Sequence, residues 1–229
     1  MIEIKKVSKR FDTLVVLDNV SFRVRDAHLV VILGPSGTGK TVLLKSIIGI
    51  QPLDEGEIFF DGVPVHKARD SEMYEVRKKI GFVFQGTALF DSMTVCENIA
   101  LPLVEHTSQS SQAIRERVNN ILDIIGLPGK GGLYPRSLSG GMKRLVAIGR
   151  ALSLNPTYLF YDEPTTGLDP IMRDRVVALI IQLRKEYKKS GIVVTHDLDT
   201  AQAVGDDIYM LKKGKISKLE QIKKEEYDV

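Results

Sequence analysis

This chain of 229 residues has little of several features that define other classes of protein. Its one cysteine, Cys96, excludes a disulfide bond within the chain and favours a reducing compartment. The net charge is only +3, so there is no electrostatic case for a nucleic-acid partner. The first residues hold no apolar signal-peptide core, and no apolar run approaches the roughly 18 residues that a membrane-spanning helix needs. Any membrane role is therefore expected to depend on a partner.

The chain does contain a glycine-rich loop, which follows an apolar run at residues 29–33. The run predicts a buried strand, and residues 41–49 predict a helix. Glycines in such a loop let successive backbone N–H groups point at phosphate oxygens, at the positive end of the helix. The loop matches the phosphate-binding pattern G-x-x-x-x-G-K-[ST] at every fixed position and consists of Gly34, Pro35, Ser36, Gly37, Thr38, Gly39, Lys40 and Thr41.

These residues predict a site for a nucleoside triphosphate and Mg²⁺. We expect Lys40 to neutralise the charge of the β- and γ-phosphates and the Thr41 hydroxyl to bind the metal. A glycine-rich turn in some other α/β protein is the alternative interpretation of the loop.

A second apolar run, residues 158–161, ends in Asp162 and Glu163. Residues that follow a strand of an open parallel sheet face the ligand crevice. Asp162 is suited to holding Mg²⁺, and Glu163 is suited to positioning and polarising the attacking water. Taken alone, two acids after an apolar run could equally be an ordinary strand end.

Two more polar residues follow predicted strands, and a second glycine-rich turn opens a predicted helix. Gln85 follows residues 80–84, and its amide can touch Mg²⁺ or the lytic water; a plain polar loop residue is the alternative. His196 follows residues 192–194. The second turn comprises Ser139, Gly140 and Gly141, and Ser139 is a natural N-cap for the helix that follows. The backbone N–H groups of this turn form an anion site that has no lysine.

The order of these motifs resembles the ATP-binding cassette (ABC) ATPase family from Phe11 to His196. The resemblance implies that Phe11 stacks on adenine, although a core phenylalanine is the alternative. It implies that His196 contacts the γ-phosphate and that residues 164–169, which end in Asp169, form the family's D-loop.

The resemblance also implies that the ATP site needs two copies of the chain. Ser139, Gly140 and Gly141 complete the ATP site of the second copy, head to tail, so that ATP closes a homodimer. The family usually has an arginine six residues after this serine, where the present chain has Leu145 and carries Arg144 one position earlier. A shift of one residue turns a side chain by about 100° around a helix, which changes the expected salt-bridge pattern but not the phosphate loop.

The predicted fold is α/β: a P-loop NTPase core with a parallel sheet, an N-terminal antiparallel β part and a helical insertion. The whole chain, 1–229, is one ABC ATPase domain, with a RecA-like core of about 1–90 and 155–229 and a helical subdomain of about 91–154. Further expected strands are residues 2–7, 14–17, 21–24, 55–60 and 207–211, and a further helix is 170–187.

Smaller features complete the expected structure. Ile114, Val118, Ile121, Leu122 and Ile125 share one helix face, with Ser111 as N-cap and Gly126 as stop. Residues 212–229 mix both charges and are expected to be a solvated surface segment.

A finer resemblance concerns the system that the ATPase serves. Residues 84–103, Met142 and residues 161–171 look like the Mla/Mce-type ATPases, which energise phospholipid trafficking between bacterial membranes. The implied role is a cytoplasmic motor subunit, peripheral on the inner membrane. Its implied partners are permease subunits and, further, a lipid-binding anchored subunit and a small regulatory subunit.

The permease is expected to dock near residues 85–105, with Ala88, Leu89 and Phe90 in its groove; packing between lobes is the alternative for these three. An ATPase of an amino-acid or other small-solute importer, or a soluble ABC assembly ATPase, remains the alternative function.

Overall fold

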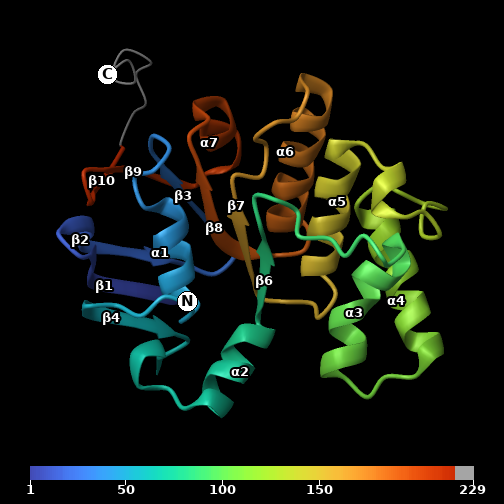
Figure 1. Cartoon of the computed structure of the whole chain (residues 1–229), viewed down its shortest axis with the longest axis horizontal. Helices are drawn as coiled ribbons and strands as arrows, with labels where there is room; N and C mark the ends of the chain where they lie inside the picture. Colours follow the sequence, from blue (N-terminus) through green and yellow to red (C-terminus); the bar gives the residue numbers. More distant parts are fainter. Residues whose placement is uncertain (220–229) are drawn as a thin grey trace.

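The structure is a computed structural model that describes residues 1–219, except the side chain of His66. It contains a six-stranded sheet and a four-stranded sheet (Figure 1). The larger sheet has the order β10-β9-β3-β8-β7-β6, and all its neighbouring strands are parallel except β10 and β9. Its strands are β3 (Leu29–Leu33), β6 (Ile80–Val83), β7 (Tyr158–Asp162), β8 (Ser190–Thr195), β9 (Asp207–Lys212) and β10 (Lys215–Lys218).

The smaller sheet is antiparallel and consists of β1 (Ile2–Phe11), β2 (Leu14–Val24), β4 (Glu55–Phe60) and β5 (Val63–Pro64), in the order β2-β1-β4-β5. The prediction of separate strands at 14–17 and 21–24 is wrong, because β2 is continuous. Asn19 adopts a left-handed backbone (φ 56°) and its N–H bonds to the hydroxyl of Ser8. The register shifts around this point but pairing resumes at Val20, as in a β-bulge.

Helices cover the parallel sheet on both sides. They are α1 (Lys40–Ile47), α2 (Asp70–Lys78), α3 (Val95–His106), α4 (Ser111–Ile124), α5 (Gly140–Ala151), α6 (Pro170–Lys185) and α7 (Leu198–Val204), with short 3₁₀ helices η1 (Val65–Lys67) and η2 (Pro135–Ser137). Alternate residues of each buried strand face different layers. In β3, Val31 belongs to the core cluster with α3 to α7, whereas Val30 and Ile32 pack with α1, α2 and the antiparallel sheet.

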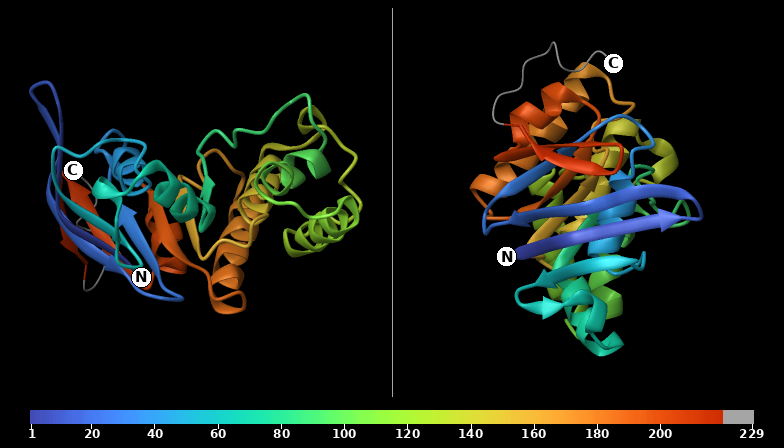
Figure 2. Two further views of the ribbon diagram at one scale, coloured as in Figure 1. Left: turned by 90° about the horizontal axis from the view of Figure 1, so that it is seen from below. Right: turned by 90° about the vertical axis from the view of Figure 1, so that its left-hand side faces the viewer.

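The antiparallel sheet lies at one end of the molecule and helices α3 and α4 lie at the other (Figure 2). The predicted α/β class with an antiparallel N-terminal part is therefore confirmed. The proposed boundaries between a core and a helical subdomain remain a prediction. In residues 1–219, no helix is both long and apolar enough for a membrane crossing.

One local prediction needs correction. The N-cap of α4 is Ser110, whose hydroxyl accepts the N–H of Ala113, and not Ser111. Strands β9 and β10 form a hairpin in which Lys213 and Gly214 both have positive φ, the usual geometry of a two-residue turn between strands. The side chains of β10 are largely exposed, as expected, and residues 220–229 lie outside the described part of the chain. The apolar face of α4 and the stop at Gly126 (φ 65°) are confirmed.

Candidate functional site

The glycine-rich loop joins the buried strand β3 to helix α1, as predicted. Gly37 (φ 81°) and Gly39 (φ 99°) adopt left-handed conformations that disfavour other residues. A Cβ atom on Gly39 would overlap Val16, and one on Gly34 would overlap the carbonyl oxygen of Leu211. The first N–H groups of α1 and its positive end are directed at the loop, and no side chain of the described residues caps them. This geometry fits a phosphate chain.

Lys40 lies at the floor of this loop and is 5% exposed. Its ammonium group donates hydrogen bonds to the carbonyl oxygens of Gly34 (2.7 Å) and Pro35 (2.9 Å). It also lies 3.4 Å from a carboxylate oxygen of Glu163. A buried cation that is held by backbone carbonyls and one carboxylate is well placed to exchange these neighbours for phosphate oxygens.

Thr41 and Asp162 bring oxygen atoms together beside the loop. The Thr41 hydroxyl lies 3.0 Å from each carboxylate oxygen of Asp162. Burial raises the pKa of the Asp162 carboxyl, and the hydrogen bond from Thr41 offsets part of this effect. A hydroxyl and a carboxylate are the donors that Mg²⁺ uses together with substrate phosphates, so the residues present fit this ion.

Glu163 follows β7 and has a left-handed backbone (φ 50°), which is uncommon for a residue with a side chain. One of its carboxylate oxygens accepts hydrogen bonds from His196 Nδ1 (2.9 Å), Thr166 Oγ1 (3.0 Å) and Thr195 Oγ1 (3.3 Å). Burial alone would raise the pKa of Glu163, but the hydrogen bond and charge of His196 and the charge of Lys40 outweigh it. The pKa therefore lies below its ordinary value, and the carboxylate is an ionised acceptor.

One pocket of about 410 Å³ gathers most of the predicted residues. Phe11, the last residue of β1, is 42% exposed at this pocket, so the alternative of a core phenylalanine is wrong. The exposed Gln85 comes from the loop after β6. The lining residues are Phe11, Val16, Ser36, Gly37, Gly39, Lys40, Thr41, Val42, Gln85, Glu163, Thr166 and His196.

Eight predicted residues are not among those that line this pocket, in the part of the chain that the structure describes. Gly34, Pro35 and Thr38 belong to the glycine-rich loop itself, and Asp162 lies beside it in contact with Thr41. The other four lie at the N-termini of α5 and α6. Ser139 is exposed and caps α5, where its hydroxyl accepts the N–H of Met142 (3.2 Å). Gly140 and Gly141 form the first turn of this helix. Asp169 is exposed and caps α6 by accepting the N–H of Met172 (3.0 Å). These residues sit at two helix N-termini away from the lysine of their own chain.

Sequence reasoning missed some contributors. Thr166 lies inside the motif after Glu163, but the motif alone gives no reason to expect its hydrogen bond to that carboxylate. Arg144 is only 4% exposed and donates a hydrogen bond to the carbonyl oxygen of Phe84 (2.8 Å), next to Gln85. Leu145, at the position where the family usually has arginine, is fully buried in the apolar core.

The parallel sheet, the glycine-rich loop at its carboxyl edge and the paired acids define an α/β protein that binds and hydrolyses ATP. The family described as ABC transporter matches residues 17–166, and the chain belongs to this family. It is an ATPase subunit of an ABC transporter.

Similar proteins include the intermembrane phospholipid transport system ATP-binding protein MlaF of Haemophilus influenzae. It is 38% identical over 216 residues, which cover 94% of this chain and 82% of that protein. The methionine import ATP-binding protein MetN of Francisella tularensis is 37% identical over 96% of this chain, which spans only 63% of the length of that protein.

Among solved structures, the dimeric post-hydrolysis state of the ATP-binding cassette MJ0796, bound to ADP and Pi, has a TM-score of 0.87 and 33% sequence identity. The match covers 97% of this chain and 100% of that one. The similarity therefore covers nearly the whole chain, and it agrees with the ATPase chemistry inferred from the pocket.

Proposed function

We propose that this chain is the motor subunit of a transporter that moves phospholipid between membranes. It works as an ATP-dependent homodimer on the cytoplasmic face of the inner membrane. The observation that carries the cargo assignment is the similarity to MlaF along 94% of the chain. The similarity to MetN is nearly as high, at 37% identity, and supports an amino-acid importer as the second candidate.

In this proposal the pocket residues divide the work on ATP. Phe11 stacks on the base, the loop N–H groups hold the phosphates, and Lys40 exchanges its loop carbonyls for phosphate oxygens. Mg²⁺, when bound, supplies positive charge to the phosphate oxygens, and Thr41, Asp162 and Gln85 would hold it.

Hydrolysis itself depends on Glu163 and His196. The ionised Glu163 orients a water molecule and draws on its proton, since a carboxylate can only accept hydrogen bonds. His196 fixes the rotamer of Glu163 through the 2.9 Å hydrogen bond and lies beside the position of the γ-phosphate.

Among the described residues, those that form the second anion site implied by the motif order do not line this pocket, which is the basis for proposing a dimer. Ser139 and Gly140 face solvent at the N-terminus of α5, whereas Gly141 is buried. We propose that the N–H groups of this turn meet the γ-phosphate of a second copy. Asp169 caps the neighbouring helix and belongs to the same proposed interface. Two ATP molecules between two chains would then hold the dimer closed until hydrolysis.

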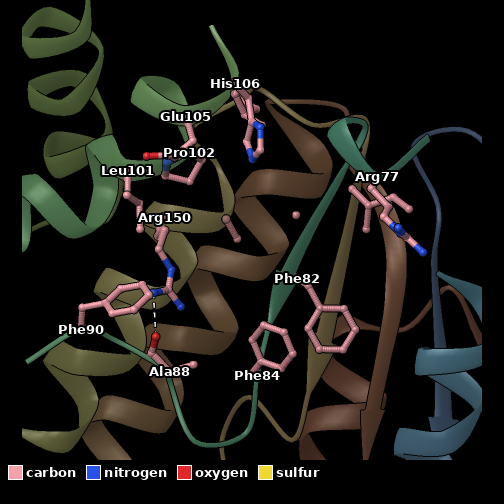
Figure 3. Close-up of a pocket in the computed structure, with 14 residues that line it drawn as sticks. Arg77, Phe82, Phe84, Ala88, Phe90, Leu101, Pro102, Glu105, His106 and Arg150 are labelled. Carbon is pink, nitrogen blue, oxygen red and sulfur yellow. Dashed lines mark hydrogen bonds between the residues drawn. The ribbon is translucent and has the colours of Figure 1, made fainter. Parts of the chain in front are cut away.

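A groove of about 630 Å³ beside β6 and α3 is the proposed docking site for the permease (Figure 3). Phe84 (39% exposed) and Phe90 (50% exposed) offer an apolar surface there, and Leu101 and Pro102 of α3 line the opposite part. Ala88 also lines the groove, but Leu89 does not: it packs against the main core cluster. The expectation for Leu89 therefore needs correction, whereas Ala88 and Phe90 are available to a cytoplasmic helix of the permease.

The stacking role of Phe11 can be tested by measuring ATP affinity. Phe11→Ala is expected to weaken binding by about 1–3 kcal/mol, which is roughly 5- to 150-fold in Kd, because one ring–base contact is lost. Isothermal titration calorimetry measures this effect directly. Leu14→Ala is the matched control, since Leu14 is 65% exposed and does not line the pocket. Equal affinities of Phe11→Ala and the unmodified chain would exclude the stacking role.

The cargo is tested by purifying a tagged Glu163→Gln variant with ATP from its native host and identifying its companions by mass spectrometry. A multi-spanning permease, a lipid-binding protein with one anchor and enriched phospholipid would support the proposal. A permease with a soluble solute-binding protein would replace it with an importer. The absence of any membrane partner would exclude a transporter motor.

The docking groove is tested by adding Phe90→Asp to the same Glu163→Gln variant. This double variant is expected to lose the permease and keep its ATP-dependent dimer, because only the groove is changed.

A further inference from the structure

Helix α5, which begins after Ser139, also holds the loop that carries Gln85. Arg144 donates through Nη1 to the carbonyl oxygen of Phe84 (2.8 Å). Arg150 donates to the carbonyl oxygens of Ala88 (2.7 Å) and Thr87 (3.0 Å), and Figure 3 shows the contact with Ala88. Two arginines of one helix thus hold the backbone on both sides of Gln85.

This loop has a backbone that its sequence does not favour. Thr87 (φ 60°) and Ala88 (φ 51°) are consecutive residues in the left-handed region, which sterically disfavours residues with a Cβ atom. Such a conformation persists where the surroundings fix it. The paired hydrogen bonds from Arg150 fix the carbonyls of Thr87 and Ala88, which come after Gln85 in the chain. Arg144 fixes the carbonyl of Phe84, which comes directly before it.

The burial of Arg144 is unusual for an arginine with so few partners. Only 4% of the residue is exposed, and its Nε is buried with no hydrogen-bond partner in the described part of the chain. Burial lowers the pKa of this guanidinium, and the negative charges of Asp162 and Glu163 offset part of the effect. The guanidinium thus holds the Phe84 carbonyl next to Gln85, and the charges of Asp162 at the end of β7 and of Glu163 after it act on it. Burying a charge is costly, so the burial of this guanidinium favours a specific role.

We propose that Arg144 is a positioning residue for Gln85. By holding the Phe84 carbonyl it fixes where the next side chain enters the ATP pocket, and it links this placement to the helix that begins at Ser139. Engagement of Ser139 with a second copy and placement of Gln85 are then coupled within one chain. This inference rests on the proposed function, in which Gln85 acts at the metal and the lytic water.

A double-mutant cycle in the full chain tests the link, because a residue that acts through another adds nothing once that partner is removed. We expect Arg144→Met and Gln85→Ala each to slow ATP hydrolysis on the order of tenfold to a hundredfold, as for a misplaced catalytic group. The double variant should be no slower than either single variant. If the fold-reductions in hydrolysis rate of the two single variants multiply in the double variant, the inference is overturned.

A binding measurement gives a readout that does not depend on turnover. The chain contains no tryptophan, so Phe11→Trp introduces one fluorophore at the pocket. In this background Arg144→Met and Gln85→Ala should both lose some of the ATP affinity that added Mg²⁺ provides, because Thr41 and Asp162 still hold the ion, and both should keep the affinity measured with EDTA. An unchanged Mg²⁺ effect in Arg144→Met would contradict the proposal.

Two further variants separate positioning from stability. Arg117→Met is the matched control, because Arg117 also donates to backbone carbonyls, those of Leu152 and Ser153, away from the pocket; it should behave like the unmodified chain. Arg144→Lys keeps a buried cation and should recover part of the hydrolysis if Arg144→Met folds poorly. If Gln85→Ala itself hydrolyses ATP normally, the proposed role of Gln85 fails. If Gln85→Ala is slow but its rate effect multiplies with that of Arg144→Met, only the link between Arg144 and Gln85 fails.

Discussion

Replacing Glu163 with glutamine is expected to slow ATP hydrolysis by roughly 10²–10⁴-fold, the range that general-base help contributes. Glutamine has nearly the same shape but no negative charge, so it cannot draw a proton from water. The pocket should keep its form, and ATP should still bind. Because its bridging γ-phosphate then persists, the ATP-bound dimer should accumulate.

The measurement pairs phosphate release with size-exclusion chromatography in ATP. Glu116→Gln is the matched control: it makes the same chemical change on α4, where the side chain accepts a hydrogen bond from Gln112 and does not line the ATP pocket. Near-normal hydrolysis by Glu163→Gln would remove Glu163 from the catalytic role.

The pKa of Glu163 adds a pH prediction for the unmodified chain. Its folded-state pKa is depressed, so the carboxylate stays ionised until the pH falls below the ordinary glutamate value of 4.5. A fall in hydrolysis between pH 7 and pH 5 would therefore have to come from a different group, and titration of activity over this interval checks that expectation.

The sequence was most predictive where function depends on short, local patterns. The loop from Gly34 to Thr41 needs only its own glycines, strand and helix, so its position and its neighbours were foreseeable. The same holds for Asp162 and Glu163, because an apolar run followed by acids places them at the carboxyl edge of a parallel sheet. Even so, the left-handed backbone of Glu163 depends on tertiary contacts that the sequence does not display.

The missed features depend on contacts between distant segments. β1 pairs with both halves of β2 across the bulge at Asn19, so a local reading of residues 14–24 finds two strands where there is one. Arg144 reaches the Phe84 carbonyl across 60 positions of sequence. A departure from the family pattern drew attention to this arginine, but only the fold reveals which group it meets. The cap of α4 shows a smaller limit, since Ser110 and Ser111 have the same chemistry and differ only in backbone geometry.

Replacing Ser139 with arginine is expected to abolish the ATP-dependent dimer while leaving ATP binding to the single chain intact. The exposed Ser139 caps α5 but does not line the pocket of its own chain. A long cationic side chain there would fill the space where the second copy brings its γ-phosphate. Hydrolysis should fall on the order of 10²–10³-fold, by analogy with loss of a preorganised anion site.

The dimer is best measured in the Glu163→Gln background, where it is expected to accumulate. Ser137→Arg is the matched control, because it places the same side chain at a nearby exposed position at the end of η2. Ser139→Ala separates the loss of the helix cap, worth about 1 kcal/mol of stability, from steric exclusion of the partner, and it should still dimerise. A Ser139→Arg chain that forms the ATP dimer normally would contradict the head-to-tail arrangement. The turn at residues 139–141 would then be only a helix cap, and the second anion site would have to lie elsewhere on the chain.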